Sequence, residues 1–134
     1  MFDYSSLVGV PYMKNGRDIS KGVDCLGLCI EYYKRKGIDN FPDFSAPNER
    51  EAIHELMMQG KDLFEELDKP EEGCIIALSI RPPFVSHIGI MIDNNRFVHT
   101  LTGKRSVIAK INDIFWSKRI RGFYRYGTTA NHKV

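Results

Sequence analysis

The hydrophobic pattern of the sequence changes at Gly73, and this change limits the folds that the chain can adopt. Before Gly73, apolar residues recur at the three- and four-residue spacing of amphipathic helices. After Gly73, short apolar runs alternate with turn residues, as in β-strands. Helices followed by strands favour an α+β architecture. We therefore expect N-terminal helices packed on an antiparallel sheet of five to six strands.

Residues 22–37 are predicted to form a capped amphipathic helix. Asp24 suits the N-cap position, and Gly37 suits the left-handed conformation that ends a helix. Cys25 falls in the first turn, where free backbone N–H groups and the helix dipole favour a thiolate. Cys25 is therefore a candidate nucleophile whose own amide could help to hold an oxyanion. The apolar stripe of this helix consists of Leu26, Cys29, Ile30 and Tyr33.

A second amphipathic helix is predicted to begin near Asn48, with Ile53, Leu56 and Met57 on its core face. His54 lies outside this face and is interpreted as a surface histidine. Further strands are expected at residues 74–80, 106–111 and 119–126, with a short strand or turn at 63–67 and a break at 81–83.

Residues 86–101 are typical of a β-hairpin, because two apolar runs flank an Asp-Asn-Asn turn. Each run contains a histidine, His87 in the first and His99 in the second. A two-residue turn would place these histidines on opposite faces, whereas a three-residue loop pairs Gly89 with His99 and puts both on one face. We predict the three-residue loop, since Asn95 tolerates a positive φ at its last position.

Cys25 and the two histidines of this hairpin would together support acyl transfer through a thioester. His87 would take the thiol proton and return it to the leaving amine, and His99 would orient the His87 ring. Two alternatives stay open, a structural role in the core and a zinc site, although the spacing is not that of a zinc finger. Cys29 and Cys74 are predicted to be reduced core residues.

Four short blocks resemble, in the same order, motifs of the NlpC family of papain-like cysteine peptidases, which cut bacterial cell-wall peptides. The blocks are Gly9-Val10-Pro11-Tyr12, Asp24-Cys25-Leu26-Gly27-Leu28, Ser86-His87-Ile88-Gly89-Ile90 and Phe97-Val98-His99. The resemblance implies a papain-like α+β fold without a cofactor. It implies Cys25 as nucleophile, His87 as general base and His99 as orienting residue.

The resemblance also implies roles for three further residues and a substrate. Tyr12 would place a hydroxyl near the oxyanion or the substrate, while Asp24 and Ser86 match residues that some members use to hold the amino end of the peptide. The implied partner is a peptidoglycan stem peptide, cut at a bond of the γ-D-glutamyl-diaminopimelate type. Two alternatives remain: an acyltransferase or amidase with the same Cys-His-His site, and a non-catalytic phage tail assembly component.

The resemblance extends to a branch of the family found in phage tail assembly proteins. It rests on Leu26, on residues 41–44 and on the C-terminal stretch 115–126, and it implies tail proteins as partners. The sequence departs from the family at Cys74, where an Asp is usual, and in the charged segment 13–21. Substrate preference could therefore differ.

A single domain is expected over residues 1–126, followed by a flexible tail over 127–134. The net charge of +2 is too balanced to indicate nucleic-acid binding. We expect no membrane span and no signal peptide, and hence cytoplasmic synthesis, with a virion tail or release to the cell wall as destinations. A basic strip near the end is interpreted as a solvated strand face, with an acidic partner as the alternative: Lys118, Arg119, Arg121 and Arg125.

Overall fold

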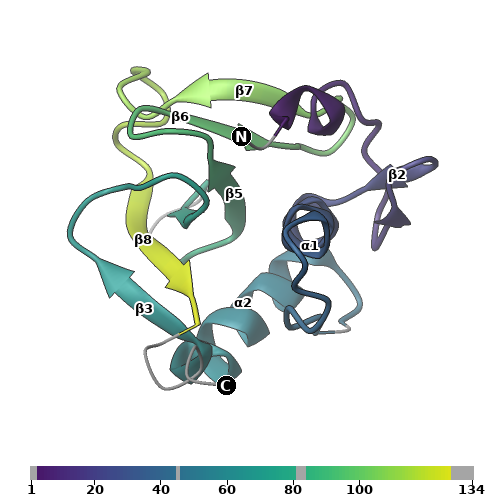
Figure 1. Ribbon diagram of the computed structural model, residues 1–134, viewed down its shortest axis with the longest axis horizontal. Helices are drawn as coiled ribbons and strands as arrows, with labels where there is room; N and C mark the ends of the chain where they lie inside the picture. Colours follow the sequence, from purple (N-terminus) through teal and green to yellow (C-terminus); the bar gives the residue numbers. More distant parts are fainter. Residues whose placement is uncertain (1–2, 45, 81–83, 128–134) are drawn as a thin grey trace.

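A computed structural model of the chain describes residues 3–44, 46–80 and 84–127. Two helices, α1 (Cys25–Arg35) and α2 (Glu49–Gln59), precede one sheet of six antiparallel strands in the order β3-β8-β4-β5-β6-β7 (Figure 1). The predicted α+β fold is therefore confirmed. The strands are β3 (Phe64–Leu67), β4 (Ile75–Leu78), β5 (His87–Met91), β6 (Arg96–His99), β7 (Val107–Lys110) and β8 (Ile120–Tyr126).

Helix α1 lies between the sheet and a small hairpin of β1 (Arg17–Asp18) and β2 (Gly22–Val23) (Figure 1). A first core cluster joins its buried face to one face of the sheet and to α2. A second core cluster, which includes Phe97 and Trp116, lies on the opposite face of the sheet. Two short 3-10 helices, η1 (Tyr4–Leu7) and η2 (Lys61–Leu63), complete the elements. The first cluster includes Leu26, Leu28, Cys29, Ile53, Leu56, Ile88, Ile90 and Val98.

Both ends of α1 follow the predicted capping pattern. The Asp24 carboxylate accepts a hydrogen bond from the backbone N–H of Gly27 at 2.8 Å. The same carboxylate pairs with the Arg17 guanidinium at 2.7 Å, and the Asp24 side chain is fully buried. At the other end, Gly37 has a φ of +89°, the left-handed conformation that glycine adopts without strain. These contacts fix the position of Cys25 as the first residue of α1.

The hairpin of β5 and β6 has the predicted register. Ile90 lies opposite Val98, and the backbone N–H of Ile92 donates to the carbonyl of Arg96 at 2.8 Å. Three residues therefore form the loop, and the same register places position 89 opposite position 99. The two histidines consequently share one face of the sheet, as expected from the two-residue period of a strand.

The predicted conformation of Asn95 is wrong. Among the described residues other than glycine, only Asn15 has a positive φ. The loop is closed by the side chain of Asp93, whose Oδ1 accepts from the backbone N–H groups of Asn95 and Arg96, each at 2.8 Å. A side-chain acceptor at the start of the loop thus replaces the left-handed residue at its end.

The central strand β4 is buried along its whole length between β8 and β5, as its apolar run predicts. Cys29 and Cys74 are buried free thiols, which confirms the prediction of reduced core residues. The expected chain break at 81–83 lies outside the described residues, as does the expected tail 127–134 apart from Gly127, whose backbone N–H donates to the carbonyl of Leu63 at 2.6 Å. Within the described segments, no helix combines the length and the apolar character needed to cross a membrane.

Candidate active site

His87 and His99 form a buried pair on one face of the sheet. The Nε2 atom of His87 lies 2.8 Å from Nδ1 of His99, a hydrogen-bond distance. Only 1% of His87 and 2% of His99 is exposed. The indole of Trp116 is stacked against the His87 ring and edge-on to the His99 ring, with centroids 5.9 and 4.9 Å away. The indole therefore limits the rotation of both rings.

Cys25 reaches this pair from the start of α1. Its Sγ, a ring nitrogen of His87 and a carboxylate oxygen of Glu49 all lie within 4.8 Å of one another. His87 Nδ1 is buried and has no hydrogen-bond partner among the described residues. Because Nε2 is engaged with His99, Nδ1 is the nitrogen left to accept the thiol proton. The structure thus brings together the cysteine and the two histidines on which the sequence prediction depends.

Burial keeps the reacting groups neutral. It raises the pKa of the Cys25 thiol well above its usual value, and the negative charge of Glu49 raises this pKa further. Burial, together with the neighbouring His99, lowers the pKa of His87 to about 3. The resting pair is therefore a thiol and a neutral imidazole. Burial and the charge of Glu49 thus act against the helix dipole, which favours a thiolate at this position.

Glu49 is a site residue that the sequence did not reveal. It is the first residue of α2, and its Oε2 accepts a hydrogen bond from the backbone N–H of Cys25 at 2.7 Å. Burial raises the pKa of its carboxyl group, and the bond from the Cys25 amide works in the opposite direction. The contact joins the first residues of two helices separated by an irregular loop. Helical periodicity gives no signal for such a contact.

Tyr12 lies at the edge of this site. Its backbone forms an isolated bridge with Val23 and donates to the carbonyl of Lys104 at 3.1 Å. Its phenol is partly buried, which raises its pKa, and an interaction with Thr102 opposes this rise. The charge of Glu49 also raises the pKa of this phenol, so the two side chains lie within electrostatic reach. A role of the hydroxyl toward substrate stays a prediction.

Asp24 and Ser86 have structural partners. Asp24 is committed to the helix cap and to Arg17, although its Oδ2 is buried without a partner among the described residues. Ser86 donates its backbone N–H to the carbonyl of Leu78, and its Oγ accepts from the N–H of Ile80 at 3.3 Å. These contacts join the start of β5 to the end of β4. Binding of the substrate amino end by Asp24 and Ser86 stays a prediction.

Among the described residues, Cys25, Glu49 and His87 form a group that could hold a metal ion. A thiolate, a carboxylate and an imidazole are all ligands that zinc accepts. The zinc set considered from the sequence included His99 in place of Glu49. In the structure, the Nδ1 of His99 is engaged with His87.

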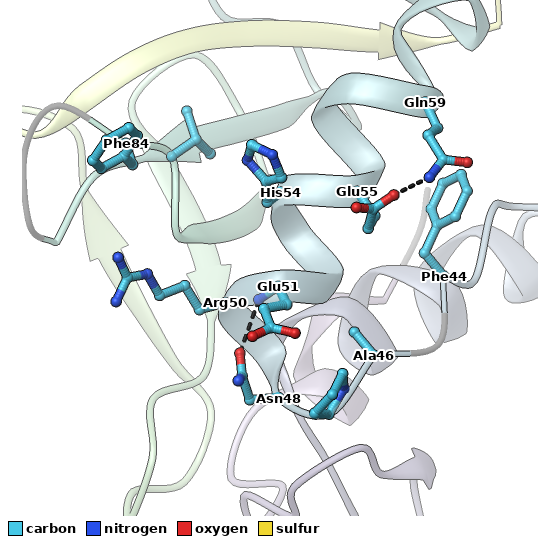
Figure 2. Close-up of a pocket in the computed structure, with 11 residues that line it drawn as sticks. Phe44, Ala46, Asn48, Arg50, Glu51, His54, Glu55, Gln59 and Phe84 are labelled. Carbon is cyan, nitrogen blue, oxygen red and sulfur yellow. Dashed lines mark hydrogen bonds between the residues drawn. The ribbon is translucent and has the colours of Figure 1, made fainter.

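A cavity of about 800 Å³ runs along α2. Figure 2 shows the side chains of α2 that line it, with Phe44 and Ala46 from the preceding loop and Phe84 from the segment before β5. Asn48 and Arg50, the neighbours of Glu49 in the chain, belong to this lining. The lining also includes Val85, two residues before His87. The cavity thus borders the two segments that carry Glu49 and His87.

Residues 9–125 match the NlpC/P60 family. The chain belongs to this family. The match includes the helix that carries Cys25 and the hairpin that carries both histidines. The family expected from the four sequence blocks is therefore confirmed. The finer placement in a phage tail branch is not part of this finding.

Two bacterial relatives are similar to most of the chain. The murein DD-endopeptidase MepS/murein LD-carboxypeptidase of Escherichia coli K12 is 26% identical over 119 residues, which are 89% of this chain and 57% of that protein. The gamma-DL-glutamyl hydrolase of Bacillus subtilis 168 is 23% identical over 119 residues, 89% of this chain and 27% of that protein. The chain therefore spans only part of the length of these relatives.

The same architecture occurs in a solved structure of the family. The NlpC/p60 domain of the peptidoglycan hydrolase SagA superposes with a TM-score of 0.59 at 16% identity, and the match covers 89% of each chain. At this identity the likeness concerns the fold alone. It agrees with the papain-like arrangement of two helices and a six-stranded antiparallel sheet.

Proposed function

We propose that the chain is a cysteine peptidase that hydrolyses an amide bond in peptidoglycan stem peptides. The observation that carries this proposal is the unpartnered Nδ1 of His87, buried beside the Cys25 thiol while Nε2 is held by His99. Membership in the NlpC/P60 family supports it. The name of one relative, a murein DD-endopeptidase, supports peptidoglycan peptides as the substrate class, and that of the other, a gamma-DL-glutamyl hydrolase, supports a γ-glutamyl bond.

The proposed reaction follows from the positions of these groups. Nδ1 of His87 accepts the thiol proton as Sγ of Cys25 attacks the carbonyl carbon of the scissile bond. The resulting imidazolium gives this proton to the leaving amine, and a thioester remains on Cys25. Water then attacks the thioester with His87 again as the base, and the acid product leaves. His99 holds the His87 ring throughout, and the chemistry uses no cofactor.

The decisive test is mass spectrometry of purified muropeptides after incubation with the protein. We expect cleavage at the γ-D-glutamyl-diaminopimelate bond by the wild type and none by Cys25→Ala. Cys29→Ala is the matched control, because Cys29 is equally buried on the same helix but belongs to the core. Cleavage that persists in Cys25→Ala would overturn the assignment of the nucleophile. Transfer to an added amine instead of water would identify an acyltransferase.

A tail-associated setting is a finer part of the proposal. Leu26 and the two stretches at residues 41–44 and 115–126, which resemble phage tail assembly proteins, support it. The partners would then be tail proteins, and the protein would reach the wall with the virion. Finding the protein in purified phage tails by mass spectrometry would support this setting. A protein without cleavage activity that still binds tail proteins would favour the non-catalytic alternative.

A further inference from the structure

The carboxylate of Glu49 lies where the oxygen of a reacting carbonyl would be expected. An attacking cysteine at a helix start can stabilise the developing oxyanion with its own backbone N–H, at about 2.7–3.1 Å. In this structure, the N–H of Cys25 donates to Oε2 of Glu49 at 2.7 Å. A single N–H cannot serve both acceptors in full. The side chain from α2 therefore competes with the substrate for this donor.

Glu49 opposes catalysis in a second way. Its carboxylate oxygen lies within 4.8 Å of Sγ of Cys25, so its negative charge disfavours formation of the thiolate. The same thiol is fully buried. Blocking of the oxyanion donor and repulsion of the thiolate would both be relieved by one movement, the withdrawal of the Glu49 side chain.

We propose that Glu49 holds the site in a closed state of low activity, and that a substrate must displace its carboxylate from the Cys25 amide. This inference rests on the proposed function, because it assigns Cys25 the role of nucleophile. The position of Glu49 allows its carboxylate to be displaced from the Cys25 amide. Its side chain is only partly buried, and Asn48, the N-cap of α2, holds the helix start through the N–H of Glu51 at 2.9 Å.

A purely structural role for Glu49 is the rival explanation. A carboxylate at a helix N-terminus stabilises the helix, and the start of α1 would be such a place. However, Asp24 already caps α1 through the N–H of Gly27 at 2.8 Å. The two roles differ in their consequence for reactivity. Removal of a structural cap disturbs the site, whereas removal of an internal inhibitor activates it.

The first experiment measures the reactivity of each thiol without any substrate. The wild type, Glu49→Ala and Glu49→Gln are treated with iodoacetamide, and the alkylation rates of Cys25, Cys29 and Cys74 are followed by peptide mass spectrometry. We expect Cys25 to react at least about tenfold faster in both variants, because a negative charge close to Sγ is lost. Glu31→Ala, which removes a carboxylate from α1 itself, should leave the rate unchanged.

The second experiment measures cleavage of muropeptides by the same variants. We expect Glu49→Ala to raise kcat/KM several-fold, since it frees the oxyanion donor. In Glu49→Gln, the rate of cleavage should rise less than the rate of alkylation. The side-chain oxygen of the introduced glutamine can still accept a hydrogen bond from the backbone N–H of Cys25. Thermal unfolding of each variant is followed in parallel. If Glu49→Ala fails to fold, Glu49→Gln replaces it in the test, because Gln keeps the size of the side chain and its hydrogen-bond acceptor.

The outcomes separate this inference from the proposed function. Unchanged alkylation of Cys25 in Glu49→Gln would overturn the inhibitory role of Glu49. Slower alkylation together with a lower Tm would also overturn it, in favour of the structural cap. Faster alkylation without any cleavage of muropeptides would support the role of Glu49 and overturn the proposed substrate.

Discussion

The hydrogen bond between His87 and His99 can run in two directions, and only one leaves His87 ready to act as a base. If Nε2–H of His87 donates to Nδ1 of His99, then Nδ1 of His87 carries a free lone pair toward Cys25. The reverse direction would protonate that nitrogen. In the proposed reaction His99 is therefore a positioning residue, since it would select the tautomer in which His87 can take the thiol proton.

Replacement of His99 tests this role at the level of one residue. We expect His99→Ala to lower kcat on muropeptides about 10²-fold with little change in KM, because the general base loses its orientation rather than its contact with substrate. His99→Gln should recover part of this loss, since its carbonyl oxygen can accept from Nε2 of His87. Steady-state kinetics on folded variants provide the measurement. A rise in KM alone would contradict the positioning role.

The residues predicted from the sequence and those that were missed differ in a physical respect. Cys25, His87 and His99 could be predicted because helix capping and strand parity are local properties of the chain. Glu49 and Trp116 act through contacts between distant segments. Glu49 does not stand out by type or spacing, and Trp116, although it is the single tryptophan of the chain, gives no indication of its partners, so only the packed structure identifies these contacts.

At the scale of elements, the hairpin of β5 and β6 aligns the two histidines because Gly89 lacks a side chain. A Cβ atom at this position would come within 2.8 Å of the Val98 carbonyl oxygen and 3.2 Å of the His99 Cβ. The period of two along each strand made the register predictable. The closure by Asp93 was not predicted, because several side-chain and backbone patterns can close a three-residue loop.

Gly89→Ala is expected to destabilise the protein by about 1–3 kcal/mol, since the added methyl group overpacks a rigid strand pair. It should also lower kcat by shifting His99 away from His87. Gly122→Ala is the control, because the three atoms nearest to its Cβ would all belong to the side chain of Tyr124, which can rotate. Urea unfolding and muropeptide kinetics on both variants provide the comparison. Equal effects of the two substitutions would contradict this account.

At the scale of the whole molecule, the histidine pair couples stability to pH. Burial lowers the pKa of His87 to about 3 and that of His99 to about 4, whereas both return to about 6.5 when the chain unfolds. Between these values the unfolded chain binds more protons than the folded chain. Stability contributed by the neutral histidines is therefore present near pH 7 and is lost as the pH falls toward 4.

We expect the free energy of unfolding to fall below pH 6.5 by at most about 1.4 kcal/mol per pH unit for each histidine. Urea unfolding between pH 7 and 4 measures this slope. The double variant His87→Gln, His99→Gln should show a shallower slope. It removes the two buried bases and leaves every Asp and Glu side chain in place. Equal slopes in the wild type and the double variant would show that the histidines are not the cause.

His87, the proposed general base, lies on β5, a strand buried at every position, next to the equally buried β4 in the middle of the sheet. Strands of this kind open only when the whole domain opens, whereas edges and loops fluctuate on their own. The catalytic geometry therefore belongs to the most cooperative part of the molecule. On heating, we expect the enzyme to keep its full turnover until the domain melts, with no separate loss of function before the fold is lost.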